Sequence, residues 1–370
     1  MSPKPMARRA TQADVARLAQ VSQTTVSMVL TGTGAAQRRV SGAVRERVLR
    51  AIEETGYAAN PVAQRLAGGR TSIIGVYTYE AVFPVVAGDF YHPFLEGVEQ
   101  AAEDAGVDLL MFTSLASKAG RGLTASGGVG RLRVADGCIL VGRHSYPEDL
   151  ADLLRRDFPF VFIGRRESAA GVVPYAGAGY AAATQEAVDQ LIALGHRRIA
   201  ALIESTEHES MRDRLEGYRT AVSRAGLEAI SFEDPDPNST ELIDALEAAG
   251  ITAAVAAPDL AAPLRRAALE REWSIPGDLS IVRLGDPERP EQIDGIDWTG
   301  FLTPRREMGA EALRLLLRQL ADSPESLTQD DLQLHLPCIP HQGATVAPPG
   351  RSTPARETRS ATARKKAQRA

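Results

Sequence analysis

One short segment near the N-terminus carries side chains suited to reading base edges in DNA. Val26, Val29 and Leu30 recur at helical spacing on one face of a possible helix over residues 23–30. Hydroxyl, amide and thioether groups on the other face match the donors, acceptors and thymine methyls of the major groove. An ordinary helical hairpin with a solvated polar face is the competing interpretation. The candidate contact residues are Ser22, Gln23, Thr24, Thr25, Ser27 and Met28.

Two further helices are predicted around this segment, and each of the three begins after a hydroxyl side chain that can accept from unpaired backbone N–H groups. Gly56 is expected to end the last of them. The caps are Thr11, Ser22 and Ser41, for helices over residues 12–19, 23–30 and 42–55. The residues expected to face the core are Val15, Leu18 and Ala19 in the first helix, and Val44, Val48, Leu49 and Ile52 in the third. This arrangement is typical of a helix-turn-helix.

A short hinge segment follows the three helices. Pro61 suits a first helical position, so residues 61–67 form a potential helix that Gly68 and Gly69 end. Leu66 is the one protruding apolar residue of this segment, and it is flanked by arginines.

Residues 11 to 74 resemble the head and hinge of the lac-repressor (LacI) family of bacterial transcriptional regulators. The shared motifs are T-x-x-D-V-A from Thr11, V-S-x-x-T-V-S from Val21, V-S from Val40, R-E-R-V from Arg45, A-I-E-x-x-G-Y from Ala51 and N-P-V-A-Q-R-L-A-G from Asn60. The resemblance implies that the second helix reads the major groove, while Leu66 wedges between bases in the minor groove. It assigns base reading to Gln23, Thr24 and Met28, phosphate or mixed contacts to Ser22, Thr25 and Ser27, and further DNA contacts to Thr11, Asn60 and Ala63.

Two positions of the head depart from the family pattern. Gln20 stands where the family usually has a turn glycine, so a non-glycine residue is expected to adopt a positive φ. Met28 occupies a position that often holds arginine, which argues against a guanine contact there and leaves the operator sequence open.

The distribution of charge agrees with a DNA-binding head. The net charge is −5, yet residues 1–70 hold eleven Lys and Arg against four Asp and Glu, and residues 351–370 hold seven against one. The residues between therefore carry a net −18. A basic head on an acidic body concentrates the attraction to phosphate at one end of the chain.

Several other classes of protein are disfavoured. Cys138 and Cys338 lie far apart in apolar runs and are interpreted as buried small hydrophobes in a reduced compartment. The basic N-terminus has no apolar core of a signal peptide, and no membrane-spanning run follows, so a cytoplasmic protein is expected. No metal-ligand spacing, nucleophile elbow or phosphate loop appears, so neither an enzyme nor a cofactor is predicted. A G-x-G-x-x-A stretch from Gly177 is weak evidence of dinucleotide binding, and His196 is expected to be a packing residue.

After residue 71 the pattern changes to β-branched strands that alternate with amphipathic helices, which predicts parallel doubly wound halves. Stretches such as HPFLEGVEQAAEDAG (92–106) and IPGDLS (275–280) resemble the family's effector domain, which shares its shape with periplasmic sugar-binding proteins. The expected fold class is an all-α helix-turn-helix head plus hinge helix, joined to an α/β two-lobed periplasmic-binding-protein-like effector domain.

The predicted boundaries place the helix-turn-helix domain at residues 1–59, the hinge helix at 60–70 and the effector domain at 71–347. A basic tail without apolar periodicity, residues 348–370, is expected to be disordered. The first lobe is predicted to comprise residues 71–171 and 301–330, and the second lobe residues 172–298 and 331–347.

The cleft between the lobes is the expected effector site, because ligands of α/β sheets lie at the carboxyl ends of the strands. The resemblance places Arg214 and Asp259 there, as a guanidinium that clamps hydroxyls or a carboxylate and as an acceptor for sugar hydroxyls. Residues on strand-end loops are the other candidates: Asp89, Tyr91, Arg143, Arg165, Asp286 and Trp298.

Three departures argue against a conventional sugar pocket. Pro258 precedes Asp259 where the family often has asparagine, one acid is missing from the segment that ends in Asp286, and no aspartate stands between Tyr175 and Tyr180. The effector is therefore an atypical sugar, a phosphorylated or acidic metabolite, or absent.

The sequence predicts a homodimeric regulator, most simply a repressor, that binds a pseudo-palindromic double-stranded operator and responds to a small molecule, with no membrane partner. One alternative is a DNA-binding regulator with a degenerate cleft that responds to a protein partner or to no ligand. The other is a solute-binding protein or enzyme with an incidental helical head.

Overall fold

The head consists, in the residues described, of three short helices around a small apolar core. The computed structural model describes residues 10–31, 40–57, 71–79, 90–112, 122–123, 128–143, 145–204, 207–287, 295–321 and 327–350. The predicted hinge helix with Asn60, Ala63 and Leu66, the candidate Asp89 and residues 351–370 of the tail lie outside this part of the chain. The helices of the head are α1 (Gln12–Ala19), α2 (Gln23–Thr31) and α4 (Gly42–Thr55).

The core of the head differs from the predicted one at two leucines. Leu18 is 46% exposed and Leu49 is 48% exposed, although both were expected to face inward. Ala16 and Ala51 are buried instead, because small side chains let α1 and α4 pack closely. The buried residues of the head are Val15, Ala16, Ala19, Val26, Val29, Val48 and Ala51.

Local hydrogen bonds confirm most of the predicted helix ends. Thr11 and Asp14 form a reciprocal capping box at the start of α1, and the Ser22 hydroxyl accepts from the N–H of Thr25 at 3.1 Å. Gly56 ends α4 in the left-handed conformation. The cap expected from Ser41 is wrong, because its side chain makes no capping hydrogen bond.

Gln20 ends α1 with φ 54° and ψ 48°, so the predicted positive φ at this non-glycine residue is confirmed. A residue with a Cβ pays about 1–2 kcal/mol to adopt this left-handed conformation, and glycine avoids that cost. Glycine also loses more conformational freedom on folding, which offsets part of the gain. We expect Gln20→Gly to stabilise the head by about 0.5–1 kcal/mol. Hydrogen exchange of the α1 and α2 amides in the full chain should slow by roughly two- to fivefold. Gln20→Ala keeps the Cβ, and equal exchange rates in the two variants would refute the strain.

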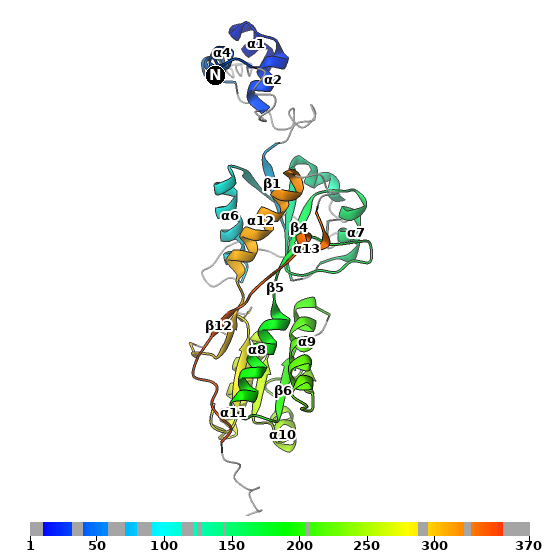
Figure 1. Cartoon of the computed structure of the whole chain (residues 1–370), viewed down its shortest axis with the longest axis vertical. Helices are drawn as coiled ribbons and strands as arrows, with labels where there is room; N and C mark the ends of the chain where they lie inside the picture. The colour runs from blue at the N-terminus through cyan, green and yellow to red at the C-terminus, as the bar shows by residue number, and fades with distance from the viewer. Residues whose placement is uncertain are drawn as a thin grey trace, which may run out of the picture.

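The body contains two sheets, each of six strands in the described residues, and they form the two lobes of Figure 1. The first has the order β11-β5-β4-β3-β1-β2 and is parallel throughout. Its strands are β1 (Ile73–Thr78), β2 (Asp108–Phe112), β3 (Gly137–Val141), β4 (Phe160–Ile163), β5 (Tyr175–Ala178) and β11 (Gln333–Leu336). The helical segments of this lobe are α6 (His92–Ala105), η2 (Gly128–Val134), α7 (Pro147–Arg155), α12 (Arg305–Ala321) and α13 (Gln329–Leu332).

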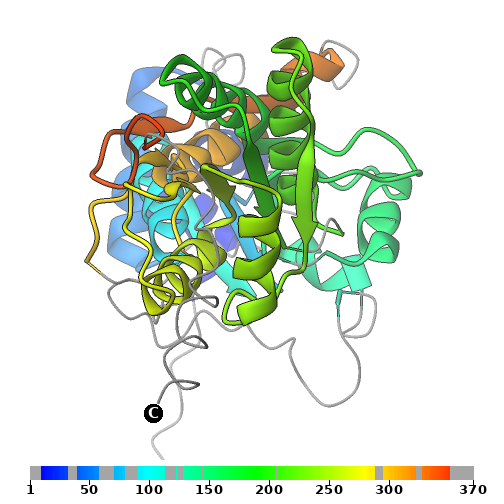
Figure 2. The same ribbon diagram turned by 90° about the horizontal axis from the view of Figure 1, so that it is seen from below.

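The second sheet has the order β12-β10-β9-β8-β6-β7, in which only β12 runs antiparallel to its neighbour among the described pairings. Helices cover both faces of this sheet, as the view from below shows (Figure 2). Its strands are β6 (Ile199–Ile203), β7 (Ile230–Glu233), β8 (Ala253–Ala256), β9 (Ser280–Leu284), β10 (Gly300–Leu302) and β12 (Ile339–His341). Its helices are α8 (Tyr180–Ala193), α9 (Glu209–Arg224), α10 (Thr240–Ala248) and α11 (Pro258–Glu270).

The chain crosses between the sheets at other points than predicted. Strand β5 was assigned to the second lobe, but it pairs with β4 and β11 of the first. Strand β10 belongs to the second sheet rather than the first. The C-terminal segment contributes a strand to each sheet, β11 to the first and β12 to the second. Each of these strands has only three or four residues, which is too short for a periodicity that tells one sheet from the other.

Close helix contacts bring helix N-termini to the junction of the lobes. A Cβ added at Gly97 of α6 would lie 1.9 Å from the carbonyl oxygen of Arg306 in α12. A Cβ added at Gly217 of α9 would lie 2.2 Å from the carbonyl oxygen of Ala181 in α8. Only glycine allows these approaches.

None of the helices in the described ranges is both long and apolar enough to cross a membrane.

The buried carboxylate of Asp136 holds the start of β1, where the chain from the head joins the body. It accepts from the backbone N–H of Thr71 at 2.9 and 3.0 Å, from the Thr71 hydroxyl at 3.0 Å and from the N–H of Ser72 at 2.9 Å. Asp136 directly precedes β3, whose far end lies at the interlobe cleft. The contact therefore fixes the path of the chain onto β1, which lies between β3 and β2 in the first sheet.

We expect Asp136→Ala to destabilise the body by about 3 kcal/mol, because it leaves several buried donors without their charged acceptor. Thermal unfolding of the full chain measures this loss. Asp108→Ala removes an exposed carboxylate on the neighbouring strand β2 and serves as the control. Equal melting temperatures for the two variants would contradict the role of Asp136.

Candidate DNA-contact face and interlobe cleft

The predicted DNA-contact residues lie on or beside α2 and differ in how accessible they are. Ser22, Gln23 and Thr24 are exposed, whereas Thr25, Ser27 and Met28 are partly buried. The hydroxyls of Ser22 and Thr25 lie 2.9 Å apart. Gln23 and Thr24 therefore present the most accessible polar side chains of this face.

Thr11 has a structural role in addition to its predicted DNA contact. Its hydroxyl donates to the carboxylate of Asp14 at 2.7 Å and accepts from the Asp14 N–H at 3.4 Å. Asp14 also pairs with Arg17. Any contact from Thr11 to DNA would therefore come from a residue that is already fixed at the start of α1.

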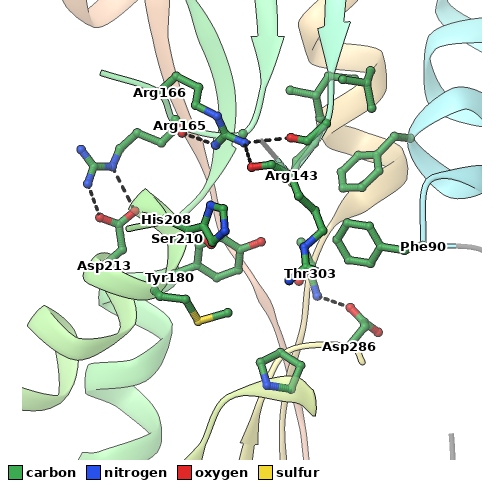
Figure 3. A pocket seen from close by; sticks show the side chains of 18 of the residues that line it. Phe90, Arg143, Arg165, Arg166, Tyr180, His208, Ser210, Asp213, Asp286 and Thr303 are labelled. Atoms are coloured by element: carbon green, nitrogen blue, oxygen red, sulfur yellow. Dashed lines mark hydrogen bonds and ion pairs between the residues drawn. The ribbon is translucent and has the colours of Figure 1, made fainter. Parts of the chain in front are cut away.

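A small cavity of about 80 Å³ lies between the lobes. The ends of β3 and β4 reach it from the first lobe, and the first turns of α8, α9 and α11 reach it from the second. Parallel strands and their helices place these ends at the same edge, which is why loops from distant parts of the chain meet here. The lining includes the candidates Tyr91, Arg143, Arg165, Arg214 and Asp286. Arg143, Arg165 and Asp286 are labelled in Figure 3.

Arg214 lies in the cleft, as the resemblance implies, and its side chain is buried and held on three sides. Its Nε donates to the carbonyl of Leu284 at 2.8 Å, its Nη1 donates to the carbonyl of Ser210 at 2.9 Å, and its guanidinium lies 3.7 Å from the ring centre of Tyr180. Within the described part of the chain, Nη2 has no hydrogen-bond partner. Gly285 faces this nitrogen, and a Cβ there would lie 3.1 Å from it. The site thus keeps one guanidinium edge accessible to a ligand.

Arg165 lines the cavity but is already bound to acids. Its Nε and Nη2 donate to the two carboxylate oxygens of Asp213 at 3.1 and 2.7 Å, and its Nη1 donates to Glu167 at 2.5 Å. Figure 3 shows Arg165 directed towards Asp213 at the margin of the pocket. Burial lowers the pKa of Arg165, but the hydrogen bonds and charges of Asp213 and Glu167 outweigh burial and raise it above its usual value. Arg165 is a fixed cation joined to the opposite lobe.

Asp286 and Tyr91 also line the cavity and make contacts within it. Asp286 accepts from the N–H of Thr303 at 2.8 Å and lies 3.7 Å from the guanidinium of Arg305. The hydroxyl of Tyr91 accepts from the N–H of Arg143 at 3.2 Å. These two predicted residues and Arg143 are thus brought to one cleft.

Two predicted effector residues lie elsewhere. Trp298 is buried in the core under Arg283, whose guanidinium is 5.4 Å from its ring centre, so its assignment to the cavity lining is wrong. Asp259 is buried at the start of α11 and lines an adjoining chamber of about 410 Å³. That chamber meets the inner cavity at Arg143 and His208.

The structure adds lining residues that the sequence did not single out. Tyr180, Ser210 and Asp213 lie on the first turns of α8 and α9. Ser210, Asp213 and Arg214 recur at i, i+3 and i+4, a helical spacing visible in the sequence but without a signal for what it faces. Arg166 crosses above the cavity and donates to the carbonyls of Gly142 and Arg143, both at 2.8 Å.

The two cysteines and His196 are buried, which agrees with the packing roles expected for them. Cys138 and Cys338 are free and buried, and burial raises the pKa of Cys338 to about 11. His196 is also buried; its Nδ1 lies 2.9 Å from the Thr252 hydroxyl and its Nε2 lies 2.8 Å from the carbonyl oxygen of Ala347, which confirms a packing role. Burial lowers the pKa of His196. The described residues contain no cluster of three or more side chains able to hold a metal ion.

The G-x-G-x-x-A stretch forms the first crossing between the lobes. Gly177 ends up in β5 of the first sheet, Gly179 follows the strand, and α8 of the second lobe begins at Tyr180. The strand-to-helix order therefore serves the connection of the lobes and the placement of Tyr180 at the cleft.

Comparisons with known proteins match both parts of the chain. The family described as bacterial regulatory proteins, lacI family, matches residues 11–60, and a periplasmic binding protein-like domain matches residues 188–336. The HTH-type transcriptional regulator CelR of Thermobifida fusca is 31% identical over 347 residues, which cover 89% of this chain and 97% of that protein. Catabolite control protein A of Priestia megaterium is 27% identical over 322 residues, with 83% and 91% covered.

Solved structures agree with the two-lobed fold. A transcriptional regulator CelR–cellobiose complex has a TM-score of 0.60 and 26% identity, and the alignment covers 91% of this chain and 100% of that one. The lac repressor dimer bound to operator and the anti-inducer ONPF has a TM-score of 0.65 and 23% identity, with 92% and 100% covered. At the latter identity the likeness concerns the fold.

Proposed function

Because the chain belongs to the lacI family of bacterial transcriptional regulators, we propose that it is a homodimeric repressor controlled by a small molecule. The effector is a sugar or a related metabolite, bound between the two lobes. The arrangement of Arg214 carries this proposal. A buried guanidinium with one accessible edge, beside the Tyr180 ring and the Asp286 carboxylate, offers donors, an apolar surface and an acceptor in one cleft.

The size of the cleft determines how a ligand would act. The cavity of about 80 Å³ is much smaller than the roughly 300–1,000 Å³ of most small-molecule sites. A sugar ring would therefore be admitted only when the lobes move apart. A ligand that favours one interlobe angle shifts the population of lobe arrangements, and its effect on operator affinity equals its differential affinity for the two states.

Dimerisation follows from the size of the DNA-contact face. One short helix with two well-exposed polar side chains, Gln23 and Thr24, offers too little surface for tight specific binding. Two heads on a pseudo-palindromic operator double the contacts and set the spacing of the half-sites. In the CelR structure the ligand is cellobiose, which supports a sugar as the first class to test here.

One feature favours a second candidate, a regulator whose cleft is degenerate and which responds to a protein partner or to no ligand. Arg165 and Asp213 neutralise each other across the cavity margin, so these two groups are not available to a ligand. A thermal-shift screen with sugars, phosphorylated sugars and carboxylic acids separates the two candidates. A ligand that raises the melting temperature and changes operator affinity supports the first, and no response from any compound supports the second.

A further inference from the structure

Opposite charges face each other where a loop of the first lobe meets the first turns of α9 in the second. The loop follows β4, and α9 belongs to the second sheet's layer of helices. Within the described residues, this interlobe ion-pair cluster consists of Arg165 with Asp213 at 2.7 Å, Arg166 with Glu209 at 3.6 Å and Glu167 with Arg212 at 2.7 Å.

Both sides of the cluster are held in place by their own lobes. Arg166 donates to the carbonyls of Arg165, Gly142 and Arg143, and its guanidinium lies 4.3 Å from the ring centre of Phe162. Glu209, Arg212 and Asp213 stand on one helix, α9, whose geometry fixes their spacing. The side chains therefore need little further ordering to meet, which reduces the entropy cost that weakens most ion pairs.

The contacts differ in burial and in geometry, and the two together decide which of them contributes most. The side chains of Arg166 and Glu209 are 8% and 13% exposed, but their charged atoms lie 3.6 Å apart. The side chains of Arg165 and Asp213 are 20% and 11% exposed and form a bidentate pair, the strong form of this interaction. Those of Glu167 and Arg212 are 60% and 40% exposed and are screened by water and salt. A backbone link, from the N–H of Glu167 to the carboxylate of Glu209 at 3.2 Å, runs between the same segments.

We propose that the interlobe ion-pair cluster holds the two lobes in their closed arrangement, with Arg165 and Asp213 as the principal positioning residues. The pairing is specific in register, because the loop contributes the cation of the inner pair, Arg165 with Asp213, but the acid of the outer pair, Glu167 with Arg212. Loss of a pair leaves the sheets intact and changes only the angle between the lobes.

A consequence for ligand affinity rests on the proposed function. A ligand that is too large for the closed cavity of about 80 Å³ binds an opened arrangement, and its apparent dissociation constant is the intrinsic one divided by the populated fraction of that arrangement. Breaking the pair of Arg165 and Asp213 should therefore tighten binding by about tenfold, within the usual range of coupling between sites. Because Asp213 and Arg214 are neighbours on α9, the positioning contact and the predicted ligand contact lie on the same helix turn.

The distance between the lobes tests the proposal without DNA or a ligand. Spin labels at Glu148→Cys on α7 and Glu247→Cys on α10 occupy exposed sites in different lobes, while the native cysteines are buried. Electron–electron resonance of the full chain should give a longer and broader distance distribution for Arg165→Glu than for the parent. The double variant Arg165→Glu/Asp213→Arg reverses both charges and should restore the short distance. An unchanged distribution in the single variant would overturn the proposal.

The outer pair, Glu167 with Arg212, gives a second test in which the charges to be reversed are on exposed side chains. Glu167→Lys should lengthen the distance less than Arg165→Glu does, and Glu167→Lys/Arg212→Glu should reverse the effect. Glu228→Lys, which breaks a pair with Arg198 inside the second lobe, makes the same change of charge and should leave the distance unaltered. If Glu228→Lys lengthened the distance as much as Glu167→Lys does, the effect could not be assigned to the position of the cluster between the lobes. A screen that finds no ligand would count against the proposed effector while the distance result stands.

Discussion

Gln23→Ala is expected to lower operator affinity by about 2–6 kcal/mol in a dimer, because each good base contact contributes about 1–3 kcal/mol and the operator has two half-sites. Gln23 is exposed at the start of α2, so its side chain adds little to the packing of the head. Fluorescence anisotropy at fixed salt measures the loss, with the selected operator and with unrelated DNA. We expect the affinity for unrelated DNA to stay nearly constant.

The sequence dependence of the loss identifies the kind of contact. A base reader relaxes specificity at one position and leaves the salt dependence of binding unchanged, whereas a phosphate contact weakens all sequences and reduces the salt slope. If Gln23→Ala lowered the affinity for all DNA sequences equally, Gln23 would not be a base reader. Gln100→Ala, on the exposed surface of α6 in the body, is the matched control and should bind like the parent.

Arg214→Gln is expected to weaken effector binding by about 1.5–3 kcal/mol, or roughly 10- to 150-fold, because hydrogen bonds from a charged donor are lost in a buried site. Operator binding without effector should persist. Isothermal titration with the strongest ligand from the thermal-shift screen measures the change. Arg214 also ties the carbonyls of Leu284 and Ser210, so the melting temperature is recorded beside the affinity.

A second arginine on the same helix separates this effect from a general change in α9. Arg219→Gln removes an exposed side chain that lies 3.6 Å from Glu233, away from the cavity lining. The affinity of this control should match that of the parent. If Arg214→Gln also bound the ligand normally, the effector site would have to be placed outside the inner cavity, the adjoining chamber beside Asp259 being the next to examine.

The head could be predicted closely because its signals are local. A cap residue, a glycine stop and a stripe of apolar residues determine each helix within a few positions, as Thr11 and Gly56 illustrate. The exposure of Leu18 and Leu49 could not be predicted. It depends on the angle at which α1 and α4 cross, and that angle follows from the small side chains at the contact rather than from the strength of the apolar stripe.

The cleft was predictable in part, for a related reason. Arg214, Tyr91 and Asp286 line it because strand ends and helix starts gather at one edge of each sheet. The pairing of Arg165 with Asp213 joins residues 48 positions apart in different lobes, and nothing in either local segment indicates it. Trp298 shows the limit of the strand-end argument, since a residue just before a strand can turn into the core instead of the cleft.

Selection of particular DNA sites by a pair of basic heads can be measured by sequencing the genomic fragments that the purified protein retains against excess bulk DNA. We expect a small set of fragments that share a pseudo-palindrome with two half-sites. Specific sites should be retained roughly 10³-fold or more in preference to bulk DNA. Retention of all fragments in proportion to their length would show that the paired heads do not select sites.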